Sequence, residues 1–372
     1  MINLFRQIIF LTLAIILRWP LCALIYIIGR TGIFKTVFLV YPTDEIEVLG
    51  FCPNIPLLRQ YLSGKPTPAG LIMNGWLPMG IYFVISDLPR DLAFKKNRHI
   101  AESIVHHMHW FRKLAGARTI GLAGQLGPIF SRRHNISMEP PIFTSIYGNI
   151  FSIHEAINWV ARQKKSFLRS QKVAVIGGGE LGITLQEYLN SQGYGCSIID
   201  VRYTMRGKVV PVQTSNSREQ LRGIDFIINL MPKGEDFITS GLKKAIPRNA
   251  AIIDFSRPAI PADQLVQKVY LGNRVRRSNM RFIFALPGGW KQKQLPACAL
   301  PSVIAAMTGQ ITEQLESFCL LARQQSFSTA LIDTPIINQT EKQSFLNKLE
   351  DSFEFETDEE LTAEGVELLS QK

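Results

Sequence analysis

Cysteine is scarce in this chain and shows no pairing pattern. The five cysteines are odd in number, lie far apart and form no Cys-x-x-Cys motif: Cys22, Cys52, Cys196, Cys298 and Cys319. This spacing argues against a disulfide framework and favours reduced thiols in a cytosolic setting. Runs of arginine, and basic residues interleaved with aromatic ones, are also missing, so we expect no nucleic-acid partner.

Acidic residues are few outside the C-terminal end. Residues 350–372 hold nine acidic side chains and one lysine, whereas the rest of the chain carries 40 basic against 21 acidic side chains. A body this basic favours anionic partners, here a membrane surface or an acidic carrier protein. We expect residues 326–372 to form an acidic, solvated tail.

The most informative stretch is a short apolar run followed by closely spaced glycines. Val173–Ile176 has the composition of a buried parallel strand, and Gly177, Gly179 and Gly182 follow it at the spacing G-x-G-x-x-G. In a dinucleotide-binding fold these glycines permit a tight turn, close approach of a pyrophosphate, and close packing of helix on strand. Apolar residues at helical spacing then place the glycines at a helix N-terminus, which suits a phosphate.

An acidic residue completes this pattern. A second strand over 196–199 ends on Asp200, in the interval where a carboxylate meets the ribose 2′-OH of a dinucleotide. We therefore predict a Rossmann domain over residues 166–325 that binds NADPH or NADH. A glycine-rich turn in some other α/β unit is the alternative. The predicted cofactor-binding residues are Gly177, Gly179, Glu180, Leu181, Gly182, Asp200, Val201, Arg202 and Met231.

The surrounding pattern predicts an α/β protein: a Rossmann-type doubly wound parallel sheet and a second α/β substrate domain. Further strands of the doubly wound sheet are expected at 225–231, 251–255 and 282–286, with ligands at their carboxyl ends. Residues 36–165 form the predicted substrate (acyl) domain, with strands at 37–40, 69–73 and 81–85 and a helix over 98–115.

Histidines on the expected helix 98–115 form a cluster with metal-like spacing. Glu102, His106 and His109 lie at i, i+4 and i+7, with His99 on nearly the same face. A metal would need further ligands that we do not find, so we predict solvated or core histidines and no metal site.

Two glycine-bearing loops are the expected substrate contacts. Gly124 follows an expected strand over 119–123, and Gly148 and Asn149 precede a helix expected over 151–163. Loops at a domain edge facing a nucleotide fold commonly bind substrate. Ordinary turns remain the alternative.

The N-terminal segment, residues 1–35, is strongly apolar. Residues 7–29 are long enough to cross a bilayer, although Arg18 lies at their midpoint and Pro20 would kink the helix. We expect a membrane-associated segment with the catalytic body on the cytoplasmic side, where the cofactor is found. A buried helix pair and a secretory signal peptide are the alternatives, but no clean small-x-small cleavage site follows.

Cys298 is the candidate nucleophile. It is the cysteine that stands at the start of an expected helix, over 302–322, just after a strand–loop segment. A helix N-terminus lowers the pKa of a thiol, and a thiolate beside a nicotinamide could attack a thioester or aldehyde. The alternative is a buried cysteine that packs as a small hydrophobic residue.

As a whole, residues 98–320 resemble the cyanobacterial-type long-chain acyl-[acyl-carrier-protein] reductases. The resemblance rests on short pieces in a matching order: helix 98–115, Leu122-Ala123-Gly124, Gly148-Asn149, the glycine turn, Ile253-Asp254, Gly288-Gly289 and Ala297-Cys298. It implies NADPH-dependent reduction of an acyl thioester, carried by acyl carrier protein or coenzyme A, to a fatty aldehyde. Cys298 would then form the acyl-enzyme.

The chain departs from that family in three places. The apolar residues 1–35 are an extension, Pro301 lies where the family continues as a regular helix, and Asp200 would repel a 2′-phosphate and so favours NADH. Two other functions therefore stay open. One is a non-covalent dehydrogenase of a small hydroxy or amino acid, similar to the shikimate-type enzymes. The other is a membrane-tethered nucleotide-binding protein without catalysis.

Overall fold

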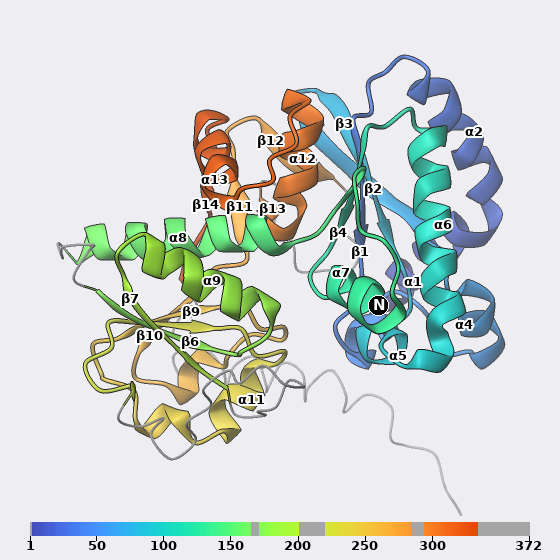
Figure 1. The fold of residues 1–372 in the computed structure, drawn as a ribbon. Helices are drawn as coiled ribbons and strands as arrows, with labels where there is room; N and C mark the ends of the chain where they lie inside the picture. The colour runs from blue at the N-terminus through green and yellow to red at the C-terminus, as the bar shows by residue number, and fades with distance from the viewer. Residues whose placement is uncertain (1, 165–170, 201–219, 284–293, 334–372) are drawn as a thin grey trace, which may run out of the picture.

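Two six-stranded sheets form the framework of the computed structural model, which describes residues 2–164, 171–200, 220–283 and 294–333 (Figure 1). The first sheet has the order β12 (Met280–Ile283), β2 (Thr67–Asn74), β3 (Leu77–Val84), β1 (Thr36–Val40), β4 (Thr119–Leu122) and β5 (Ile142–Phe143). Its strands β3, β1, β4 and β5 are parallel, whereas β2 and β12 are antiparallel to their neighbours.

The second sheet is the predicted Rossmann sheet. Its order is β15 (Ile332–Asp333), β10 (Lys268–Leu271), β9 (Ala251–Asp254), β8 (Phe226–Asn229), β6 (Lys172–Ile176) and β7 (Gly195–Ile199). All of these strands are parallel except β15. The central strands are apolar and buried along almost their whole length, as parallel strands covered on both faces must be. The α/β fold class is therefore confirmed.

Helices cover both sheets and connect them. Helix α6 packs on the first sheet through Ala101, Ile104, Met108 and Phe111, which recur at helical spacing. Helix α8 runs between the two lobes in Figure 1 and is buried along most of its length. The described α-helices are α1 (Ile2–Leu11), α2 (Arg18–Gly29), α3 (Glu45–Leu49), α4 (Pro56–Leu62), α5 (Pro89–Leu92), α6 (Arg98–Leu114), α7 (Leu126–Pro128), α8 (Ile146–Gln163), α9 (Glu180–Ser191), α11 (Gly234–Thr239), α12 (Leu300–Thr308) and α13 (Leu315–Gln324).

Three sequence expectations about elements are wrong. The strand expected at 282–286 to continue the doubly wound sheet overlaps β12 at 282 and 283, and β12 pairs antiparallel with β2 of the first sheet, while residues 284–286 lie outside the described residues. The helix expected over 302–322 is two helices, because Gly309 adopts a left-handed conformation that ends α12. Helix α8 begins at Ile146, so Gly148 and Asn149 lie in its first turn and not in a preceding loop.

The chain thus returns to the first lobe after β10. A small sheet of β13 (Leu295–Pro296), β11 (Arg274–Arg276) and β14 (Ser328–Thr329) follows, and α12 then packs against β4 and β1. The range 166–325 predicted for the cofactor domain therefore includes strands and helices that lie on the first sheet. The described part of the 326–372 segment includes β14 and β15, which are paired within the fold.

The N-terminal segment is a sharply bent helix pair. A short π-helical segment, η1 (Thr12–Ile16), links α1 to α2, and the two halves meet at 73°. Among the described residues no single helix has the length and apolar composition to cross a bilayer, although this bent pair passes both criteria when its halves are combined. Phe10 and Ala14 join one hydrophobic core, whereas Cys22 and Ile25 join the core beneath α6.

Candidate functional site

The glycine turn between β6 and α9 has the geometry that a dinucleotide needs. Gly177 adopts a φ of +120°, which favours glycine, and a side chain on Gly182 would collide with the carbonyl oxygen of Gly177. A side chain on Gly179 would instead meet open space. Helix α9 begins at Glu180 with no side-chain cap, so its first N–H groups are available to a phosphate.

Asp200 stands at the carboxyl end of β7, where the ribose of a dinucleotide is bound. Its carboxylate accepts a hydrogen bond of 2.9 Å from the N–H of Gly178, which ties the end of β7 to the glycine turn. The residues at the turn therefore fit a nicotinamide dinucleotide, and NADPH or NADH is the cofactor of this fold. Val201 and Arg202 lie outside the described residues.

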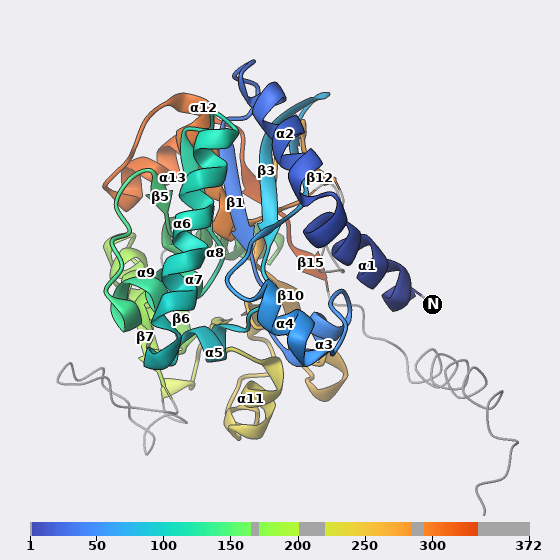
Figure 2. The same ribbon diagram turned by 90° about the vertical axis from the view of Figure 1, so that its right-hand side faces the viewer.

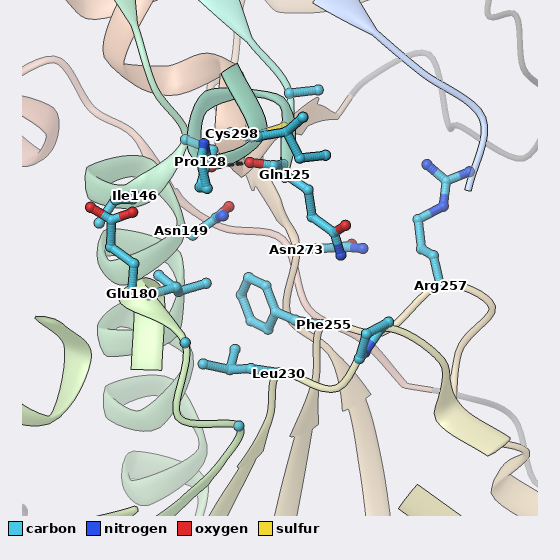
Figure 3. A pocket seen from close by; sticks show the side chains of 18 of the residues that line it. Gln125, Pro128, Ile146, Asn149, Glu180, Leu230, Phe255, Arg257, Asn273 and Cys298 are labelled. Carbon is cyan, nitrogen blue, oxygen red and sulfur yellow. Dashed lines mark hydrogen bonds between the residues drawn. The ribbon is translucent and has the colours of Figure 1, made fainter. Parts of the chain in front are cut away.

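A cavity of about 470 Å³ lies between the two lobes (Figure 3). The dinucleotide lobe contributes the glycine turn and the residues that follow β8 and β9, and the first lobe contributes residues that follow β1 and β4 and the start of α8. Nine of the residues predicted from the sequence line this cavity: Gly124, Asn149, Gly177, Gly179, Glu180, Leu181, Gly182, Met231 and Cys298. The structure thus brings the predicted cofactor turn, the predicted nucleophile and two of the predicted substrate residues together.

Gly148 has a packing role in this arrangement. A side chain at this position would collide with the carbonyl oxygen of Ala297, because α8 passes close to the short helix η7 (Ala297–Ala299). Gly148 therefore allows the contact that holds Cys298 over the cavity, and it is not among the cavity-lining residues.

Cys298 lies in η7, directly before α12, with its side chain half-buried at the cavity wall. Burial raises the pKa of its thiol to about 11, although the N–H of Gly124 and the charge of Arg257 act in the opposite direction. The lowering that a helix N-terminus provides is thus outweighed by the loss of water. At neutral pH the side chain is a thiol and not the expected thiolate.

Tyr41 is a functional candidate that the sequence analysis missed. Its hydroxyl oxygen accepts a hydrogen bond of 3.0 Å from the N–H of Gln125, and it lines the same cavity as Cys298. Burial raises the pKa of this phenol to about 12. Tyr41 directly follows β1, so the rule that ligands gather at the carboxyl ends of parallel strands would have identified it.

A buried carboxylate holds the loops on the dinucleotide side of the cavity. Asp254, fully buried at the end of β9, accepts hydrogen bonds from the Asn229 amide at 2.8 Å, the N–H and hydroxyl of Ser256, and the N–H of Ile260. These contacts fix the segment that carries Phe255 and Arg257 into the cavity. Burial nevertheless raises the pKa of the Asp254 carboxyl.

Two ion pairs connect the lobes across the cavity. Arg257, after β9, pairs with Glu47 of α3, and Arg132, in the short helix η3 (Ile129–Arg133), pairs with Glu180 of α9 at 3.1 Å. In Figure 3, Glu180 and Arg257 lie on opposite sides of the cavity, with Asn149, Gln125 and Asn273 between them. Both arginines line the cavity and were also missed from the sequence.

The histidine cluster on α6 does not form a metal site with other residues in the described part of the chain. Its members are His99, Glu102, His106 and His109. Across the described ranges no group of three or more histidine, cysteine or acidic side chains is placed to hold a metal ion. His106 is exposed on α6, and burial lowers the pKa of His107 and His109 on the same helix.

No protein-family model and no curated protein matches the chain. Solved structures that match include one component of the dipicolinate synthase from Bacillus halodurans, with 15% identity over 40% of this chain and 55% of that chain, and a TM-score of 0.26. A D-isomer specific 2-hydroxyacid dehydrogenase family protein from Klebsiella pneumoniae 342 matches at 13% identity, over 60% and 71% of the two chains, with the same TM-score of 0.26. The D-lactate dehydrogenase of Escherichia coli matches at 13% identity, over 62% and 77%, also at 0.26.

These similarities correct the family resemblance drawn from the sequence. The resemblance to acyl-[acyl-carrier-protein] reductases is wrong, because the named structures include dehydrogenases of small hydroxy acids and no acyl reductase. This chain spans only about half of the length of the dipicolinate synthase component, at 55%. The chain has the fold and the cofactor turn of an NAD(P)-dependent oxidoreductase.

Proposed function

We propose that this protein is an NAD(P)-dependent dehydrogenase that transfers a hydride directly between the cofactor and a small hydroxy or oxo acid. The observation that supports this proposal is the shared cavity, in which the glycine turn of one lobe faces Tyr41 and Cys298 of the other. Catalysis at such a lobe junction requires a cofactor cradle, a proton donor and a group that orients the substrate.

The cradle consists of the glycine turn, the start of α9 and Asp200. When bound there, the nicotinamide cofactor supplies the hydride for reduction of a carbonyl group, or accepts it from an alcohol. Asp200 offers a carboxylate to the ribose hydroxyls and would repel a 2′-phosphate, so NADH is the expected cofactor.

Tyr41 is the proposed proton donor. Its hydroxyl oxygen already accepts the N–H of Gln125, which leaves the phenolic proton free to point elsewhere in the cavity. In the direction of reduction, Tyr41 would donate its phenolic proton to the carbonyl oxygen of the substrate, and solvent would later restore that proton. A pKa of about 12 keeps this proton on the phenol at neutral pH.

The charge of the cavity favours an anionic substrate. Arg132, Arg133 and Arg257 line it, with Glu180 as the carboxylate among the lining residues. Arginine binds carboxylates through paired hydrogen bonds, and Arg257 lies at the side of the cavity away from the glycine turn. We therefore assign substrate carboxylate binding to Arg257, which would exchange its ion pair with Glu47 for the substrate, aided by the amides of Asn149 and Asn273.

The test is to follow cofactor oxidation with NADH or NADPH and a panel of small oxo acids. Tyr41→Phe is expected to lower kcat by roughly 100-fold or more, because it removes the proton donor, without weakening cofactor binding. Tyr61→Phe, an exposed tyrosine on α4, is the matched control and is expected to have no effect. Full activity in Tyr41→Phe would exclude this role.

Cys298→Ala separates direct transfer from covalent catalysis. Direct transfer predicts that this variant keeps its rate within a few-fold, since no bond to sulfur forms. Loss of turnover, together with an acyl group trapped on Cys298 of the unmodified protein by labelled thioester, would instead favour the covalent mechanism. Binding of cofactor without oxidation by any substrate in the panel would favour a nucleotide-binding protein without catalysis.

A further inference from the structure

We propose that the N-terminal helices dock this protein on the surface of an anionic bilayer, lying in the interface without crossing it. Large hydrophobic side chains are exposed at 23 positions of the described chain, and ten of these positions fall within residues 4–27. We call these ten side chains, on α1, η1 and α2, the N-terminal apolar face. Phe5 is 65% exposed, Ile16 70% and Trp19 73%, so this surface is not part of the core.

The bend of the helix pair rules out a straight span while it stays folded. Phe10 and Ala14 are buried in one hydrophobic core, and Cys22 and Ile25 are buried in the other. Straightening the 73° bend would withdraw one of these pairs from its core. The pair is therefore anchored to the protein on one side and exposes apolar side chains on the other, as helices that lie in a membrane interface do.

The N-terminal apolar face continues onto α3 and α4. The Gln7 amide donates a 2.6 Å hydrogen bond to the carbonyl of Leu49, and the rings of Phe10 and Phe51 stack edge to face at 4.9 Å. Five more exposed hydrophobic side chains lie within residues 46–61. Figure 2 shows α1, α2, α3 and α4 on one side of the molecule, turned toward the viewer.

The basic side chains around this face favour anionic lipids over neutral ones. Residues 4–43 contain four basic side chains, Arg6, Arg18, Arg30 and Lys35, and no acidic one, although one guanidinium nitrogen of Arg18 is buried in the protein. The adjoining helix α3 carries Glu45 and Glu47, and both of these carboxylates are paired with arginines of the same chain. Arg30 lies over the exposed ring of Tyr26, with its guanidinium carbon 5.5 Å from the ring centre. Tryptophan and tyrosine at the interface, with arginine beside them, match the headgroup region of an anionic leaflet.

A second copy of the chain fits this face less well. A two-fold interface would bring the same patch of both copies together, and with it Arg6 and Arg30 of each. The carboxylates of the adjoining α3, Glu45 and Glu47, are already paired with arginines of their own chain. An anionic bilayer satisfies both the apolar side chains and the basic ones. The cytoplasmic leaflet is the one expected, because the cofactor site lies on the same chain.

The test is co-sedimentation of the full chain with vesicles of phosphatidylcholine alone, or of phosphatidylcholine mixed with phosphatidylglycerol. We expect binding to the mixed vesicles and at least about tenfold weaker binding to the neutral ones. Trp19→Glu combined with Ile27→Glu is expected to abolish binding. Arg6→Glu combined with Arg30→Glu is expected to weaken it about tenfold and to reduce its dependence on salt.

Ile311→Glu combined with Leu320→Glu is the matched control, since both side chains are exposed far along the chain from this face. Unchanged NADH binding in every variant verifies that the fold is intact. Failure of the full chain to bind either type of vesicle would overturn the proposal. The proposal would also be overturned if the variant with Trp19→Glu and Ile27→Glu dissociated a dimer but bound lipid as well as the unmodified protein does.

Discussion

Burial sets the protonation of the two reactive side chains that share the cavity. Cys298 has a hydrogen bond from the N–H of Gly124 and the positive charge of Arg257 to stabilise a thiolate, yet its pKa rises to about 11. Tyr41 has a similar N–H donor in Gln125, and its pKa rises to about 12. Burial destabilises each anion more than the neighbouring N–H group or charge stabilises it, so both residues hold a proton at neutral pH.

The reactivity of Cys298 tests this conclusion directly. With a pKa of about 11 against an ordinary value of 9.0, the thiolate fraction at neutral pH is roughly 100-fold below that of a free thiol. We expect alkylation by iodoacetamide, followed at the Cys298 peptide by mass spectrometry, to be slower by about that factor and to rise with pH beyond 9. Alkylation at neutral pH as fast as that of a free cysteine would contradict a buried thiol.

At the scale of elements, each glycine of the turn is required for a different reason. Gly182 has no room for a side chain, because α9 lies against the carbonyl oxygen of Gly177. Gly179 has room and a φ of −69°, which any residue can adopt, but its open side is where a pyrophosphate would lie. The sequence motif is therefore a combination of a packing requirement and a ligand requirement.

Alanine substitutions separate these two requirements. Gly182→Ala is expected to destabilise the fold by about 1–3 kcal/mol through overpacking, measured by chemical denaturation. Gly179→Ala is expected to keep the unfolding free energy unchanged and to weaken NADH binding by about tenfold or more, measured by titration. Equal effects of both substitutions on stability would refute the distinction.

The contact between α8, α9 and α13 contains a buried histidine that makes stability depend on pH. Nδ1 of His154 lies within hydrogen-bond distance of the Tyr188 hydroxyl, at 2.9 Å, and of the Arg323 guanidinium, at 3.2 Å. Burial, with Arg323 beside it, lowers the pKa of His154 to about 4. Other titratable groups nearby are Tyr194, Cys319, and Glu155, which pairs with Arg323.

The sign of this dependence follows from the two protonation states. Between pH 4 and 6.5 the unfolded chain binds a proton at His154 that the folded chain does not, so stability falls as the pH is lowered through this range. The expected loss is about 3 kcal/mol, measured by denaturation at a series of pH values. His154→Asn supplies a similar acceptor that does not titrate, so it should flatten the profile; an unchanged slope would assign the effect elsewhere.

At the scale of the whole molecule, the cavity lies where two lobes meet, and two ion pairs join the lobes at its edges. Arg132 of the first lobe pairs with Glu180 at the start of α9, the position where a cofactor phosphate would lie. Glu180 thus holds Arg132 beside the phosphate site, while its own charge opposes the phosphate. Cofactor binding is expected to exchange this ion pair for a contact between Arg132 and phosphate.

Substitutions of the two partners should therefore have opposite effects. Arg132→Gln is expected to weaken NADH binding by about three- to tenfold and to reduce its dependence on salt, whereas Glu180→Gln is expected to strengthen binding by a similar factor. Arg90→Gln, an exposed arginine outside the cavity, is the control and should change nothing. The exchange would be refuted if both variants weakened binding alike.

Local pattern determined the dinucleotide half of this protein. The buried run of β6, the glycine spacing and Asp200 all lie within one continuous stretch, so the strand, the turn and the helix follow from neighbouring residues and are confirmed. The cofactor-binding roles of these residues stay a prediction. The helix over 98–115 was equally predictable, because its apolar spacing is regular.

Only the tertiary structure decided the rest, because it depends on contacts between residues distant in the chain. The pairing of β12 with β2 joins residues about 200 positions apart, and nothing within 280–283 distinguishes the first sheet from the second. The same is true of Tyr41 and Arg257, which reach the cavity from different lobes, and of Cys298, whose pKa is affected by Gly124 of one lobe and Arg257 of the other. The apolar composition of the N-terminal segment fits a membrane span as well as a packed helix pair. The packing of Phe10 and Ile25 into two different cores is what bends it.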